Sequence, residues 1–128
     1  MTVQIAHLYG LGCLGIIFFQ IALIAGAPLG AYTQGGQHEG PLPLAGRVIA
    51  AVSIPVVLFQ ALGILSAAGF PGLGWPRWTG WAALGVSVLT LVLNTITPSP
   101  RERAVWAPVA LVMAGLAGYV MIVTMGQV

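Results

Sequence analysis

The chain alternates between long apolar stretches and short polar breaks that contain proline and glycine. Every Arg and Glu lies in or beside one of these breaks. A membrane-spanning helix needs about 20 apolar residues to cross a hydrocarbon core of about 30 Å. Four stretches meet this requirement, at about residues 6–27, 44–68, 79–97 and 104–125.

The apolar stretches are predicted to be helices. An unpaired backbone amide in hydrocarbon costs several kcal/mol, so a spanning segment has to be a helix or a strand of a closed barrel. The stretches are continuously apolar and lack the alternation of a barrel strand. The sequence therefore predicts an all-α fold, an integral membrane antiparallel four-helix bundle, as a single transmembrane domain over residues 1–128. Pro55 is expected to kink the second helix.

The composition excludes a soluble protein. Of the 128 residues, 59% are hydrophobic and only 5% are charged, whereas about 25% of the residues of a soluble domain are charged. Four spans leave no room for an extramembrane domain. The four arginines are too few and too dispersed for a nucleic-acid surface.

The arginines predict the orientation. An even number of crossings places both termini and the loop with Arg77 on one side, and places Arg47, Arg101 and Arg103 on the other. Because cytoplasmic loops are enriched in Arg and Lys, the second side is predicted to be cytoplasmic. The expected location is the bacterial cytoplasmic (inner) membrane, multi-pass, with both termini outside. A dual topology is the alternative.

The two polar breaks on the predicted cytoplasmic side supply candidate contact residues. The break at residues 32–41 is either a plain connector or a loop in which His38 and Glu39 handle protons near neutral pH. The arginines either bind anionic lipid headgroups or act as topology determinants that pair with Glu39 or Glu102. The candidate partner or lipid contacts are His38, Glu39, Arg47, Arg101, Arg103 and Trp106.

A polar face is predicted along the third helix. Ser87, Thr90, Asn94 and Thr97 recur at intervals of three or four residues and therefore share one side of the helix. Such residues either line a hydrated path or hydrogen-bond to packed helices. The amides of Gln20 and Gln60 lie deep in the first two stretches, and we expect them to pair with neighbouring helices.

No cofactor, metal site or catalytic residue is predicted. His7, Cys13, Met121 and Met125 fall in the same half of the membrane, and sulfur ligands suit Cu(I). Core methionines and an interfacial histidine are the simpler interpretation. His38 belongs to the opposite side, so a haem held by two histidines of one monomer is excluded.

Several short runs resemble a family of small, uncharacterised bacterial membrane proteins with four transmembrane helices. The runs are Gly26-Ala27-Pro28-Leu29-Gly30, Gly35-Gly36-Gln37-His38, Leu42-Pro43 with Arg47, and Ser99-x-Arg101-Glu102-Arg103-x-x-Trp106-x-Pro108. The resemblance implies no activity, but it implies that the two charged loops belong to one site. Ala31 stands where that family often has an acidic residue, which weakens a proton-transfer role.

These observations favour a non-catalytic membrane protein that works by helix association, as a homo-oligomer or as an accessory subunit of a membrane complex. Small residues at Ala110, Ala114 and Gly118 permit close helix approach. The alternative is a small oligomeric channel or carrier for a neutral or anionic solute, lined by the polar face of the third helix. A transporter normally carries an ionisable residue inside its pathway, and no acidic residue lies within these helices.

Overall fold

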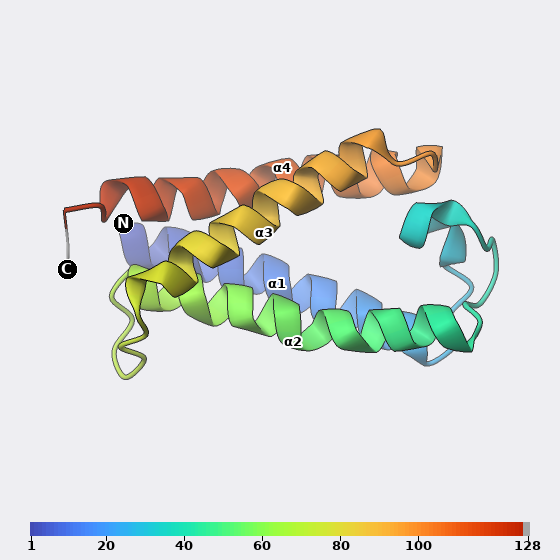
Figure 1. The fold of residues 1–128 in the computed structure, drawn as a ribbon, viewed down its shortest axis with the longest axis horizontal. Helices are drawn as coiled ribbons and strands as arrows, with labels where there is room; N and C mark the ends of the chain where they lie inside the picture. The colour runs from blue at the N-terminus through green and yellow to red at the C-terminus, as the bar shows by residue number, and fades with distance from the viewer. Residues whose placement is uncertain (127–128) are drawn as a thin grey trace.

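The structure, a computed structural model, describes residues 1–126 and is built of helices (Figure 1). Each of the four α-helices is long and apolar enough to cross a membrane. The predicted all-α membrane bundle is therefore confirmed. The elements are α1 (Thr2–Ile24), the 3-10 turns η1 (Gly30–Tyr32) and η2 (Gln34–Gly36), α2 (Leu44–Ala67), α3 (Arg77–Ile96) and α4 (Pro100–Val123).

Two helices begin earlier than the apolar pattern suggests. α1 begins at Thr2 rather than near residue 6, and α4 begins at Pro100 rather than near residue 104. Ser99 caps α4, because its hydroxyl accepts a hydrogen bond from the Glu102 backbone N–H at 3.1 Å. Proline suits the first helical position, where its missing N–H has no partner to lose. The polar break before α4 is correspondingly short.

α2 continues through Pro55 as one helix. Proline has no N–H, so the carbonyl of Ala51 receives no hydrogen bond from the residue one turn later. The backbone hydrogen bonds of α2 on either side of Pro55 keep the helix continuous.

The helices are arranged so that the molecule has two different ends (Figure 1). One end holds the N-terminus, the end of α4 and the loop between α2 and α3, and we call it the terminal end. The other end holds residues 25–43 and 97–99, and we call it the polar end. α3 crosses obliquely from beside α2 at the terminal end to beside α4 at the polar end, so α2 and α3 diverge towards the polar end (Figure 1).

The tightly packed core lies towards the terminal end. Glycines allow the closest approaches: a Cβ added at Gly63 would lie 2.9 Å from the carbonyl oxygen of Thr79, and one at Gly80 would lie 2.6 Å from the sulfur of Met121. Small residues let helix backbones approach closely, which improves the van der Waals packing that helps to hold membrane helices together. Residues with no exposed surface in this core are Ala6, Tyr9, Ile64, Ala83, Ala117, Val120 and Met121.

The two loops of the polar end are joined. The Ser99 hydroxyl donates a hydrogen bond to the carbonyl oxygen of Ala31 at 2.6 Å. Gly36 has a φ of +70°, and a Cβ there would lie 2.6 Å from the Cβ of Ser99, so only glycine fits. The expectation that the first and third loops meet at one surface is thus confirmed.

Candidate functional site

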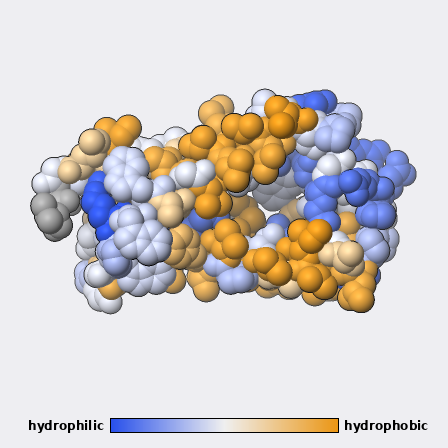
Figure 2. All heavy atoms as spheres, viewed as in Figure 1, coloured by the Kyte–Doolittle hydropathy of each residue, from blue (hydrophilic) through white to orange (hydrophobic). Residues whose placement is uncertain are grey.

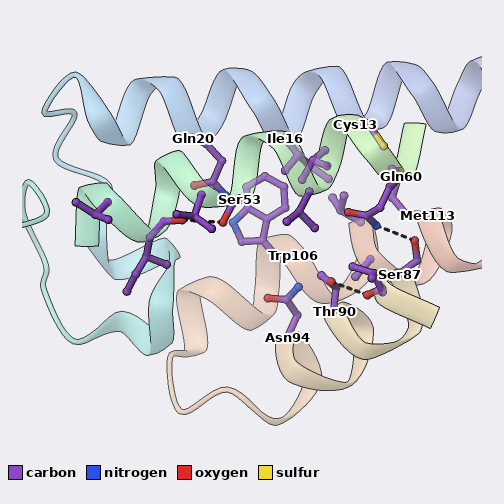
Figure 3. A pocket seen from close by; sticks show the side chains of 18 residues that line it. Cys13, Ile16, Gln20, Ser53, Gln60, Ser87, Thr90, Asn94, Trp106 and Met113 are labelled. Atoms are coloured by element: carbon purple, nitrogen blue, oxygen red, sulfur yellow. Dashed lines mark hydrogen bonds between the residues drawn. The ribbon is translucent and has the colours of Figure 1, made fainter. Parts of the chain in front are cut away.

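A cavity of 430 Å³ lies between the four helices, in the half of the bundle nearer the polar end (Figure 3). Valine and isoleucine side chains of α2 make much of its wall, and Trp106 and Met113 of α4 close the opposite side. Aliphatic walls with a few polar groups are typical of small-molecule sites. The polar side chains on the cavity are Gln20, Ser53, Gln60, Ser87, Thr90 and Asn94.

The cavity opens sideways between α2 and α3. Figure 2 shows the surface hollowed between these two helices, with apolar side chains on both flanks. On the α2 side the lining residues Val48, Ile49 and Val52 are exposed, and on the α3 side Thr90 is exposed. These residues lie within helices of membrane-spanning length. The opening therefore faces the hydrocarbon of the bilayer.

Three buried polar side chains from three helices meet where the cavity borders the tight core. The hydroxyls of Tyr9 on α1 and Ser87 on α3 are hydrogen-bonded at 2.6 Å. The amide nitrogen of Gln60 on α2 donates to both oxygens at 3.2 Å. Because all three side chains are buried, their hydrogen bonds are strengthened by the low local dielectric and fix the register of α1, α2 and α3. We call it the polar triad.

The polar triad meets one expectation and adds a residue that the sequence did not single out. The pairing of Gln60 with neighbouring helices is confirmed. Tyr9 was missed, although a tyrosine inside an apolar helix is itself a signal, since a buried phenol needs a hydrogen-bond partner. Gln20 differs from the expectation: its buried Oε1 atom accepts no hydrogen bond in the described residues.

Removing one hydroxyl from the polar triad should destabilise the bundle. Tyr9→Phe keeps the ring but leaves Gln60 and Ser87 with one partner fewer, and we expect a loss of about 1 to 2 kcal/mol in the free energy of unfolding. Tyr119→Phe is the matched control, because Tyr119 is 38% exposed on α4. Thermal unfolding in detergent measures both. Equal midpoints for the two variants would contradict a stabilising triad.

The residues of the predicted polar face of α3 lie in three places. Ser87 belongs to the polar triad, and Thr90 and Asn94 line the cavity, where Thr90 donates to the Val86 carbonyl of its own helix at 2.8 Å. Thr97 lies just past the end of α3 and donates its hydroxyl hydrogen to the carboxylate of Glu102. A second hollow at the polar end is also bordered by Thr90 and Asn94, together with Gln34, Thr97 and Glu102. Polar groups thus run from the polar end to the triad.

Two of the candidate arginines have structural bonds. Arg47 is half-buried and donates from Nε to the Leu42 carbonyl at 2.8 Å and from Nη1 to the Ile24 carbonyl at 3.5 Å. Arg103 donates to the Thr97 carbonyl at 2.9 Å. None of these three bonds involves a carboxylate, and Glu102 is buried against Thr97 instead. The expected pairing of arginine with Glu102 is replaced by bonds that close the ends of α1 and α3.

The other candidate contacts lie in two different environments. His38, Glu39 and Arg101 are exposed at the polar end. Trp106 is half-buried, lines the cavity and packs against Phe19 with ring centroids 4.8 Å apart. The six candidates therefore divide by environment: His38, Glu39, Arg101 and Arg103 are exposed, Arg47 is half-buried, and Trp106 belongs to the cavity. Of these, Arg47 and Arg103 also bond to backbone carbonyls.

The four residues weighed for a soft metal lie in different environments, and one of them, Met125, is 62% exposed and is therefore not a core methionine. Cys13 is buried on the cavity wall, and Met121 is buried in the core. His7 is exposed and lies edge-on to Phe70, with ring centroids 5.6 Å apart. Within residues 1–126, no group of three or more His, Cys, Asp or Glu side chains is placed to hold a metal ion.

Comparisons with protein-family models, with curated proteins and with solved structures return no match for this chain. Any functional interpretation therefore rests on the geometry of the chain itself. It has a cavity open to lipid, a polar triad at the inner side of that cavity, and a polar end on which two loops are joined.

Proposed function

We propose that this chain is a non-catalytic integral membrane protein that works by association, with copies of itself or as an accessory subunit of a larger membrane complex. The small bacterial four-helix family that it resembles is its proposed family. The observation that carries the proposal is the junction at the polar end, where Ser99 bonds to Ala31 and fixes one loop against the other. This junction turns two polar loops into one surface.

A fixed surface favours association because little conformational freedom is lost on binding. Arg47, Arg103 and Glu102 are engaged in bonds that hold the loops in place. His38, Glu39 and Arg101 remain exposed, so the surface carries charges of both signs. Exposed charges at the rim of an interface select partners and set their orientation more than they add affinity.

The proposed orientation places the polar end in the cytoplasm and both termini outside, in the bacterial inner membrane. Arg47, Arg101 and Arg103 are at or beside the polar end, whereas Arg77 begins α3 at the terminal end. Arginine enrichment on the cytoplasmic side is the physical basis of this orientation. Anionic lipid headgroups are additional contacts proposed for the polar end.

Association is tested by purifying the protein from its native membrane in a mild detergent. We expect to recover a stoichiometric partner chain or a defined homo-oligomer. The amount of this assembly should fall several-fold when Arg101 at the polar end is replaced by glutamine. Gln4→Glu changes the net charge equally, at an exposed position of the terminal end, and should leave the assembly intact. A monodisperse monomer without a partner, from both wild type and control, would refute the proposal.

The second candidate is a small oligomeric channel or carrier for a neutral or anionic solute. The observation in its favour is that Thr90 and Asn94 border both the cavity and the hollow at the polar end. This polar route ends at Tyr9, because beyond it the core has no exposed surface. Solute flux into vesicles that contain only this chain, abolished by Asn94→Leu, would favour this candidate over the accessory subunit.

A further inference from the structure

We propose that the cavity between α2 and α3 is a binding site for an uncharged amphiphile of the lipid phase, with a hydroxyl-bearing head and an apolar chain. The ligand would enter sideways from the bilayer, with its head towards the amide of Gln20. The inference goes beyond association at the polar end, and it requires only that the helices span a membrane.

The lining of the cavity selects an uncharged ligand. None of its lining residues is Asp, Glu, Lys, Arg or His. A charged head would have no partner there and would lose its hydration, which is prohibitive in an apolar environment. The walls instead present aliphatic side chains and the indole of Trp106, as a hydrocarbon chain or a ring requires.

The polar atoms select a hydroxyl. Gln20 lines the cavity, and its Oε1 is buried without a hydrogen-bond donor among the described residues, so the amide has to rotate to present a polar atom to a ligand. The Thr90 hydroxyl hydrogen is donated to Val86, which leaves its oxygen free to accept. Figure 3 shows the Gln20 and Asn94 amides on opposite sides of Trp106. A hydroxyl both donates and accepts, so it matches either orientation that an amide adopts by rotating about its last torsion.

The shape of the bundle sets the route of entry. The core at the terminal end is closed, and the loops of the polar end are joined through Ser99 and Ala31. The side between α2 and α3 is open, and apart from Thr90 the exposed lining residues named above are apolar (Figure 2). The volume of 430 Å³ falls within the range of about 300 to 1,000 Å³ that small-molecule sites occupy.

The test uses the purified full chain in lipid nanodiscs. The probe is a long-chain alcohol that carries a photoreactive diazirine, and the reference probe is its methyl ether, which cannot donate a hydrogen bond. After irradiation, mass spectrometry locates the labelled residues. We expect saturable labelling of the cavity wall around Val52 and Thr90, several-fold stronger with the alcohol than with the ether.

Two variants separate the head site from the cavity. Gln20→Leu should bring the alcohol-to-ether ratio at the wall close to one while both probes still enter. Ser53→Phe places a ring in the cavity, which Ser53 lines, and should reduce labelling by both probes. Leu14→Phe is the control for added bulk, because Leu14 is 46% exposed and is not a lining residue.

Three results would overturn the inference. The first is labelling spread evenly over outward-facing residues such as Leu14 and Phe18, which would mean bulk lipid contact only. The second is an alcohol preference that Gln20→Leu does not change. The third is crosslinking of a second copy into the cavity of the first. If Ser53→Phe does not fold, the ratio measured with Gln20→Leu decides. These results do not depend on whether a partner chain co-purifies, so the cavity inference and the proposed association can fail independently.

Discussion

Replacing Arg47 by methionine is expected to lower the free energy of unfolding by about 2 to 3 kcal/mol, which is the contribution of a charged hydrogen bond together with a helix-end charge. The guanidinium donates to the carbonyls of Leu42 and Ile24. Ile24 is the last residue of α1, where the helix dipole is negative. Without Arg47, the end of α1 and the loop that follows it lose a common anchor.

The matched control for Arg47→Met is Arg101→Met. Both variants remove one positive charge from the polar end, but Arg101 is exposed. Surface charges of this kind contribute about 0 to 1 kcal/mol. The loss of stability caused by Arg47→Lys should lie between the losses caused by the two methionine variants, because an ammonium group lacks the forked geometry that reaches both carbonyls. Chemical or thermal unfolding in detergent measures the difference, and equal losses for Arg47→Met and Arg101→Met would show that Arg47 acts only as a surface charge.

Labelling of single cysteines should give an all-or-none pattern across the membrane. In intact cells, a membrane-impermeant maleimide is expected to react with Pro71→Cys in the loop at the terminal end. Gln37→Cys and Pro98→Cys at the polar end should react only after permeabilisation. All three positions are exposed, whereas the native Cys13 is 1% exposed and gives no background.

Each departure from this labelling pattern has a distinct meaning. Reaction of Gln37→Cys and Pro98→Cys from opposite sides would refute the four-pass arrangement itself. The fully inverted pattern would keep four passes but reverse the proposed orientation. Partial labelling of every position from outside would indicate a dual topology, in which the modest arginine bias does not decide the insertion.

The spans could be predicted from the sequence because each apolar stretch is bounded by prolines and glycines, and because a bilayer fixes the length of a crossing. The start of α4 was harder to place by hydropathy, since Arg101, Glu102 and Arg103 look like loop residues. Capping chemistry locates the start of α4 better. Ser99 is at the N-cap, Pro100 follows it, and Glu102 lies three residues after Ser99, which is the signature of a helix start.

The cavity could not be predicted, because it depends on how the helices cross. Close contacts at Gly63 and Gly80 hold α3 near its neighbours at the terminal end, whereas Ser99 joins the start of α4 to the first loop at the polar end. The divergence of α2 and α3 between these constraints is a tertiary property. The sequence shows that the buried amide of Gln60 needs a hydrogen-bond partner. That Tyr9 and Ser87 are the partners could not be predicted, because it depends on the relative register of three helices.

Pro55 interrupts the backbone hydrogen bonds of α2 beside the opening of the cavity. One backbone bond is missing between Ala51 and Pro55, and Val52 and Val56 beside it line the cavity. A helix is least stiff where its ladder is interrupted. We therefore expect α2 to bend more easily at the level of the opening than in the half packed through Gly63, so that the opening could fit ligands of different widths.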